Sequence, residues 1–250
     1  GNEFPLLIKF IDANDVLSIQ VHPDDKLARQ RHNSFGKTEM WYVMQADPGA
    51  RLISGFKQET DKKEYLKALE TNKIDNLLAS HEVEPGDVFY IPAGRVHAIG
   101  KGILLAEIQQ TSDVTYRIYD FDRRDAEGHS RELHTAQALD AIDFSGGKEY
   151  KTQYEAKENE VTPIIESPYF VTSLIELHGH ELKKDIYNFD SFVILMCVEG
   201  NAEIIFYDGQ KEPLQTGETV LIPAELKEFS IKTAEKCKLL EVHMPDVDGK

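Results

Sequence analysis

Hydrophobic positions along the chain fall in short runs, separated by glycine, proline, asparagine and aspartate. Within many runs apolar and polar side chains alternate, which is typical of strands with one buried face. Turn residues at short intervals are typical of antiparallel sheets. The pattern therefore predicts an all-β sandwich or barrel, with strands over residues 6–11, 17–22, 40–45, 51–56, 88–93 and 103–109.

One segment departs from this pattern. Between residues 61 and 79 the apolar side chains recur at roughly helical spacing, at Tyr65, Leu66, Leu69, Ile74, Leu77 and Leu78. Apolar residues three or four positions apart share one face of an α-helix. We predict a small α-helical insertion over residues 58–80, and shorter helices near residues 24–30 and 132–142.

The chain also contains an internal repeat. The segment EPGDVFYIPAGRVHAI (84–99) returns in outline as QTGETVLIPAELKEFSI (215–231), and TEMWYVMQADPGARLI (38–53) aligns loosely with SFVILMCVEGNAEIIF (191–206). Paired motifs of this kind resemble the cupin superfamily, whose fold is a double-stranded β-helix. We expect two tandem cupin barrels, over residues 1–145 and 146–250. The alternative is a chance similarity between two strand–turn–strand units.

Four potential metal ligands lie on separate segments of the first half, namely Gln20, His22, Glu39 and His97. Residues two apart on a strand face the same side, so Gln20 and His22 can point together into a barrel. Two imidazoles, one carboxylate and one amide oxygen suit a borderline divalent ion such as zinc and leave a position for water or substrate. Alternatively, His22 caps the turn at Pro23 and His97 is a structural strand histidine.

The second half keeps the repeat without these ligands. At the aligned positions Phe192 replaces Glu39, and Glu228 replaces His97. The scaffold persists where the ligands do not. We therefore expect a degenerate, metal-free second barrel.

Four segments of the first half together resemble type I mannose-6-phosphate isomerases, especially the short bacterial form. They are FPLLIKFIDANDVLSIQVHPDD (4–25), FGKTEMWYV (35–43), VFYIPAGRVHAIG (88–100) and QQTSDVTYRIYDFDR (109–123), in the family's order. Family members carry a further segment before the first of these, so we expect this sequence to be a fragment or a trimmed form. The resemblance implies metal ligation by Gln20, His22, Glu39 and His97, and active-site roles for Lys37, Asp113 and Arg117.

The reaction that this resemblance implies interconverts D-mannose 6-phosphate and D-fructose 6-phosphate through a cis-enediol, whose oxyanion a metal ion would stabilise. Lys37 would be the base, because a nearby cation favours its neutral amine; a metal-bound hydroxide is the alternative. Arg117 would bind the phosphate or the enediolate, and Asp113 would orient Arg117 or relay a proton. Without such roles, Lys37 is a surface lysine, and Arg117 pairs with Asp120 or Asp122 at the surface.

Composition limits the other possibilities. A net charge of −16 opposes binding to nucleic acid or anionic lipid, and no apolar run approaches the ~18 residues of a membrane span. We expect a cytoplasmic protein, monomeric or homodimeric, with Cys197 and Cys237 as buried thiols. Two other functions stay open. One is an Fe(II) cupin oxygenase, and the other is a sugar-phosphate-binding cupin that has lost turnover.

Overall fold

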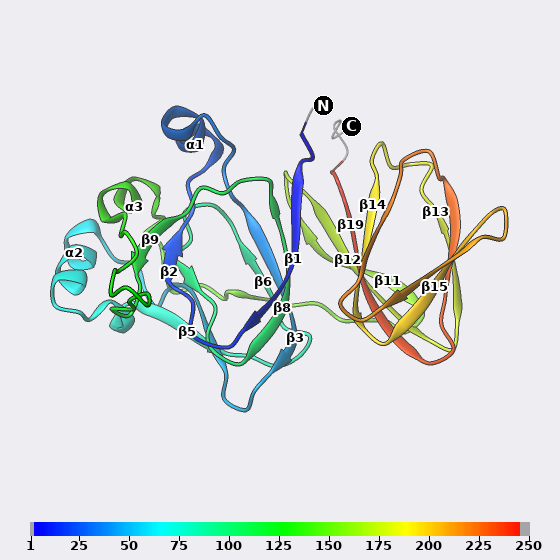
Figure 1. Ribbon diagram of the computed structural model, residues 1–250, viewed down its shortest axis with the longest axis horizontal. Coiled ribbons are helices and arrows are strands. Elements are labelled where there is room, and N and C mark those ends of the chain that lie inside the picture. Colours follow the sequence, from blue (N-terminus) through cyan, green and yellow to red (C-terminus); the bar gives the residue numbers. More distant parts are fainter. Residues whose placement is uncertain (1–2, 246–250) are drawn as a thin grey trace. The chain divides into compact units, whose positions relative to one another are not determined.

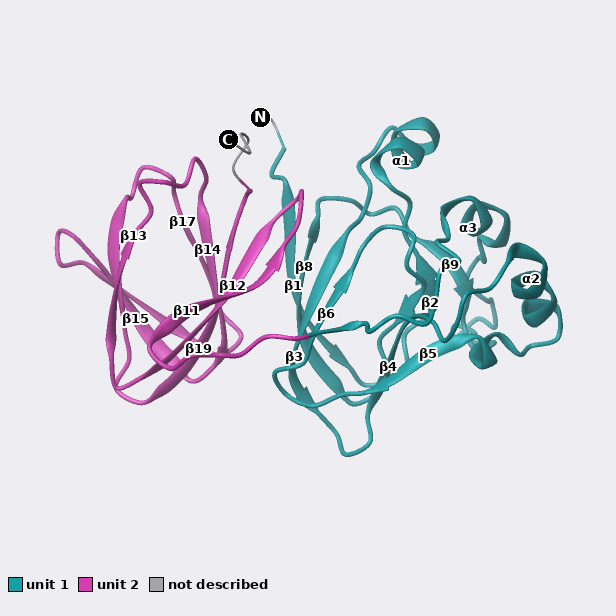
Figure 2. Cartoon of the chain, turned by 180° about the vertical axis from the view of Figure 1, so that it is seen from behind, with its two compact units in different colours: residues 1–152 teal, residues 153–250 magenta. Residues whose placement is uncertain are grey.

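The chain consists of two compact units, residues 1–152 (unit 1) and 153–250 (unit 2), shown in different colours in Figure 2. The computed structural model describes residues 3–245. Residues 151–152 pair with strand residues 88–89 of unit 1. Unit 1 therefore extends beyond residue 145, the predicted end of the first barrel. Among residues 3–245, no helix is both long enough and apolar enough to span a membrane.

Unit 1 contains two five-stranded antiparallel sheets, with orders β1-β8-β3-β6-β10 and β5-β4-β7-β2-β9. Both are visible in Figure 1. The first sheet comprises β1 (Leu6–Ala13), β3 (Glu39–Ala46), β6 (Val88–Ile91), β8 (Ile103–Gln110) and β10 (Lys151–Thr152). The second comprises β2 (Ile19–Val21), β4 (Arg51–Phe56), β5 (Leu78–Glu82), β7 (His97–Ala98) and β9 (Tyr116–Tyr119). All six strands predicted from the hydrophobic runs are present.

Alternation along these strands produces the core between the sheets. Trp41 and Val43 of β3 and Leu105 of β8 pack in one cluster with Leu52 of the second sheet. On the strands of the second sheet, the alternate residues point the other way. Val21, for example, faces outward into another cluster, which the helices cover. The interior of unit 1 is therefore a packed barrel, and the metal-ligand candidates lie on its inner wall.

Three helices lie beside the second sheet of unit 1: α1 (Asp25–His32), α2 (Lys62–Glu70) and α3 (Thr135–Ala141). Asp61 caps α2 by accepting a hydrogen bond from the backbone of Glu64, at 2.8 Å. The predicted helical insertion is thus confirmed, but it is shorter than expected. A 3-10 turn (Ile74–Asn76) follows α2, and Leu78 then begins strand β5, where it pairs with Phe56.

Unit 2 repeats the two-sheet plan with orders β11-β12-β19-β14-β17 and β13-β18-β15-β16. Its first sheet comprises β11 (Glu160–Glu166), β12 (Val171–His178), β14 (Val193–Glu199), β17 (Thr219–Ile222) and β19 (Lys236–His243). Its second comprises β13 (Glu181–Asp185), β15 (Asn201–Phe206), β16 (Lys211–Gln215) and β18 (Glu228–Lys232). Cys197 and Cys237 are free thiols buried in its core. The prediction of an all-β chain with two tandem cupin barrels and a small helical insertion is confirmed.

Candidate metal centre

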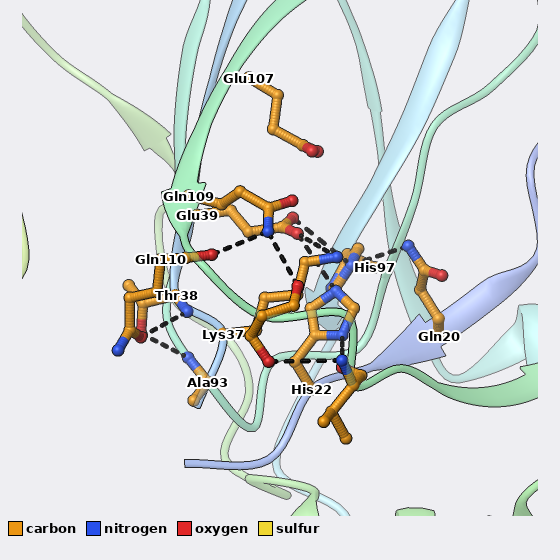
Figure 3. Close-up of polar contacts among 12 residues, drawn as sticks. Gln20, His22, Lys37, Thr38, Glu39, Ala93, His97, Glu107, Gln109 and Gln110 are labelled. Carbon is orange, nitrogen blue, oxygen red and sulfur yellow. Dashed lines mark hydrogen bonds and ion pairs between the residues drawn. The ribbon is translucent and has the colours of Figure 1, made fainter. Parts of the chain in front are cut away.

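His22, Glu39 and His97 converge inside unit 1, as Figure 3 shows. His22 follows the end of β2, Glu39 begins β3 and His97 begins β7. The Nε2 atom of His22 lies 3.2 Å from Oε1 of Glu39, and Nε2 of His97 lies 3.8 Å from Oε2. Ligands bound tetrahedrally to one zinc ion lie roughly 3.3 Å apart. The three side chains can therefore hold one metal ion.

Hydrogen bonds orient both imidazole rings so that Nε2, the nitrogen free to bind a metal ion, faces Glu39. Nδ1 of His22 lies 3.1 Å from the carbonyl oxygen of Val114, and Nδ1 of His97 lies 2.8 Å from that of Arg95. A carbonyl oxygen can only accept a hydrogen bond, so each Nδ1 carries the proton and donates it. Each Nε2 keeps its lone pair for a metal ion.

The charges of the cluster also match those of a metal site. Burial lowers the pKa of His22 and lowers that of His97 to about 3, so both rings are neutral near pH 7. Burial alone would raise the pKa of Glu39, but the two imidazoles, once protonated in acid, and the ammonium group of Lys37 hold it well below its ordinary range. Both Glu39 oxygens are buried and have no hydrogen-bond partner within residues 3–245. Since such a carboxylate is costly to bury, these residues fit a cation.

Gln20 adjoins the same cluster. Its amide nitrogen lies 3.3 Å from Nε2 of His97, and Figure 3 shows the two side chains next to each other. A half-turn of the amide exchanges its nitrogen and oxygen, which directs the oxygen toward the same point. The structure thus brings together all four residues that the sequence pointed to as ligands.

The three other predicted residues lie at different depths. Lys37 is buried, with its Nζ 3.2 Å from Oε1 of Glu39, so it is not a surface lysine. Arg117 pairs in register with Gln20 across β2 and β9, and its Nη1 donates to the carbonyl oxygen of Glu132 at 2.9 Å. Asp113 is exposed in a surface depression of about 400 Å³. No hydrogen bond or ion pair joins Asp113 to Arg117 in the part of the chain that the structure describes.

Glu107 was not predicted as a site residue, yet it lies in the same interior. It is 4% exposed, accepts a hydrogen bond from Trp41 Nε1 at 2.9 Å, and pairs with Lys9 at 2.7 Å. Burial and the charge of Glu39 raise its pKa. The signal in the sequence is a pair of polar residues, Glu107 and Gln109, at alternate positions of the apolar run ILLAEIQQ. Alternation puts both on the inner face of β8.

The strand registers correct the predicted alignment of the two repeats. Glu39 pairs with Ile91 in unit 1, and the residue that pairs with Ile222 in unit 2 is Val193, so the counterpart of Glu39 is not Phe192. His97 corresponds to the buried Phe229 rather than to the exposed Glu228, because one extra residue follows the second Ile-Pro-Ala. An ungapped alignment misses this insertion. Both inner positions are apolar in unit 2.

A lysine occupies the position of Gln20 in the second barrel. Lys184 pairs in register with Phe229, as Gln20 pairs with His97. Its Nζ lies 2.8 Å from the carboxylate of Glu241, whose side chain is buried, while that of Lys184 is 10% exposed. The interior of unit 2 thus contains a positively charged side chain, that of Lys184.

Acid is expected to destabilise the metal-free protein through its buried histidines. The folded-state pKa lies below 6.5 for His22 and is about 3 for His97. Between about pH 6.5 and 3 the unfolded chain binds more protons than the folded one, so the free energy of unfolding falls as the pH falls. Below 4.5, protonation of Glu39 acts in the same direction.

Denaturant unfolding of chelator-treated protein at about pH 7.5 and about pH 5 would measure this loss. The fluorescence of Trp41, the single tryptophan of the chain, reports on unit 1, since its ring lies 5.3 Å from that of His97. A His97→Gln variant should show a weaker dependence on pH. Equal slopes for the two proteins would contradict the prediction.

Together, the fold and these side chains define a cupin with a candidate metal site in its first barrel. The family model of the mannose-6-phosphate isomerase cupin domain matches residues 160–244, and that of the phosphomannose isomerase type I catalytic domain matches residues 1–51. This chain belongs to the type I mannose-6-phosphate isomerase family, as the resemblance predicted.

Known proteins of the family match over most of the chain. Mannose-6-phosphate isomerase ManA of Bacillus subtilis is 39% identical over 240 residues, which are 95% of this chain and 75% of that protein. The mannose-6-phosphate isomerase of Streptococcus mutans is 42% identical over 177 residues, 70% of this chain and 56% of that protein. A crystal structure of the Bacillus subtilis mannose 6-phosphate isomerase superposes with a TM-score of 0.87 and 33% identity, covering 98% of this chain and 76% of the other.

Proposed function

We propose that this chain is a metal-dependent aldose–ketose isomerase that interconverts D-mannose 6-phosphate and D-fructose 6-phosphate through a cis-enediol. The observation that supports this most directly is the buried cluster of His22, Glu39 and His97 in a member of this family. We further propose a cytoplasmic enzyme, monomeric or homodimeric. Its net charge of −16 agrees with an absence of nucleic-acid or membrane partners.

Gln20, His22, Glu39 and His97 would hold one divalent ion, and their mixed nitrogen and oxygen donors favour zinc. When bound, the ion supplies Lewis-acid stabilisation of an oxyanion on the sugar. The residues around it then have to bind the sugar and move one proton between C2 and C1.

For the proton transfer we propose Lys37. Its Nζ is enclosed beside Glu39 and close to the ligand cluster, which supports a role in the reaction. Glu107 is a second candidate in the same interior, because burial raises its pKa toward the range in which a carboxylate becomes an effective base. A Lys37→Met variant and a Glu107→Gln variant would show which of the two side chains is needed for exchange of the C2 proton with solvent.

Arg117 is proposed to bind the phosphate or the enediolate, and Asp113 to support the same step from the rim. Replacing Arg117 with alanine is expected to leave the bound metal in place and to lower kcat/KM at least about a hundredfold, since a charged hydrogen bond to the reacting anion is lost. Metal analysis and steady-state kinetics on the same preparation would measure both. Arg124→Ala is a suitable control, because within residues 3–245 the side chain of that arginine hydrogen-bonds to a single loop carbonyl, that of Gly128. Loss of metal from the Arg117 variant would contradict the assignment.

A coupled assay for fructose 6-phosphate formed from mannose 6-phosphate, with and without added zinc, tests the proposed function. Turnover that a chelator abolishes and zinc restores is the expected result. Binding without turnover would instead identify a sugar-phosphate-binding cupin. Oxygen uptake with Fe(II) would identify an oxygenase, although Gln20 in place of a third histidine disfavours that reaction.

A further inference from the structure

Ser54 places a hydroxyl group on the inner wall of unit 1 beside the metal-ligand cluster. It lies on β4, and the strand register pairs it with His97 of β7. Opposed residues of antiparallel strands point to the same face. Its neighbours agree with this direction, because Leu52 packs in the inner cluster and Ile53 in the outer one. Ser54 therefore faces the interior, as His97 does.

The hydroxyl of Ser54 is buried and has no hydrogen-bond partner among residues 3–245, whereas the backbone around it is held firmly. The carbonyl oxygen of Ser54 accepts a hydrogen bond from His81 Nε2 at 3.3 Å, and the amide of Gly55 donates to Val96 at 2.8 Å. Gly55 has a φ of +76°, and the ring of Tyr150 occupies the space that a Cβ would take. The backbone that carries Ser54 is thus held in place, while its hydroxyl has no partner among the described residues.

The ring of His97, the register partner of Ser54, does not donate a hydrogen bond to this hydroxyl. The proton of His97 Nδ1 is donated to the carbonyl oxygen of Arg95, and Nε2 faces Glu39. A serine hydroxyl both donates and accepts hydrogen bonds, as each hydroxyl of a sugar does. A sugar oxygen next to His97 therefore matches Oγ in chemistry as well as in position.

We propose that Ser54 is a substrate-binding residue whose Oγ hydrogen-bonds to a hydroxyl or carbonyl oxygen at the reacting end of the sugar phosphate. This inference rests on the proposed function, because it assigns a contact within the same site. The contact places the C1 and C2 oxygens on the His97 side of the cluster.

Ser54→Ala in the zinc-loaded chain tests the proposal. We expect KM for mannose 6-phosphate, and the dissociation constant for fructose 6-phosphate measured by calorimetry, to rise about tenfold, as for the loss of one hydrogen bond. Zinc content and Tm should not fall, since the variant only removes a buried hydroxyl that lacks a partner. A role confined to folding would change Tm and leave the binding constants unchanged.

Thr172→Val is the matched control. Thr172 also carries a buried hydroxyl without a partner in the described residues, but it lies on β12 of unit 2, so its loss should leave KM and the dissociation constant unchanged. If the wild type is active and Ser54→Ala binds the sugar phosphates equally well, the proposal is overturned. Oγ would then not contact the substrate. Loss of zinc from Ser54→Ala overturns it as well. If the wild type neither binds nor converts the sugar phosphates, the proposed function fails and this contact fails with it.

Discussion

Replacing Glu39 with alanine is expected to remove both the bound metal and the isomerase turnover. Its carboxylate lies within 3.2 Å of His22 Nε2 and within 3.8 Å of His97 Nε2, and is the negatively charged member of the cluster. Loss of even an outer partner of a metal ligand typically weakens metal binding 10–100-fold, and loss of a ligand should exceed about a hundredfold. The variant also leaves the ammonium group of Lys37 buried without its carboxylate.

Metal analysis after dialysis and the coupled isomerase assay would measure the two losses on one sample. Glu39→Gln keeps the shape of the side chain and removes its charge, so it should lose metal in the same way. Glu82→Ala is the control, because the side chain of this exposed glutamate forms one ion pair in the described part of the chain, with Arg51 at 3.3 Å. A Glu39→Ala protein that retained its full metal content would show that the ion binds elsewhere.

His22, Glu39 and His97 could be predicted as ligands because each lies in a short motif at the end or beginning of a strand. In SIQVHPDD the spacing of two puts Gln20 and His22 on one face of a strand, and the barrel then requires the other ligands to come from facing strands. The structure places all four side chains together. The sequence carried this information because strand alternation is a local property.

Ser54 and Glu107 were less accessible to the same reasoning. A single serine in RLISGF, or a glutamate in ILLAEIQQ, looks like an ordinary outward-facing polar residue until the register of the neighbouring strands is known. Register depends on pairing between residues far apart in sequence, such as Ser54 with His97. The same dependence explains why Leu78 was expected in a helix. Its apolar side chain fits either periodicity, and pairing with Phe56 decides for the strand.

Register also decided which residues of unit 2 replace the ligands. Counting from Ile222 without a gap leads to Glu228, a polar residue that would suggest a possible ligand, whereas the buried inner position belongs to Phe229. Apolar residues thus stand in two of the ligand positions, and Lys184 stands in the place of Gln20. The ammonium group of Lys184 balances the charge of the buried carboxylate of Glu241 inside unit 2.

Lys184→Met is therefore expected to destabilise the chain by about 3–5 kcal/mol, because removing one partner of a buried ion pair leaves the other charge unpaired. The remaining charge is that of Glu241, which is 2% exposed. Denaturant unfolding followed by circular dichroism would measure the loss. The fluorescence of Trp41 before denaturant is added would show whether unit 1 is still folded in the variant.

A second substitution separates the charge effect from a packing effect. Adding Glu241→Leu to Lys184→Met removes the unpaired carboxylate and should recover most of the lost stability, since apolar residues of similar size can replace a buried pair at little cost. Lys211→Met is the control, because its exposed pair with Glu203, at 3.0 Å, should be worth only about 0–1 kcal/mol. A double variant no more stable than Lys184→Met alone would mean that the methylene chain of Lys184, and not its charge, stabilises the second barrel.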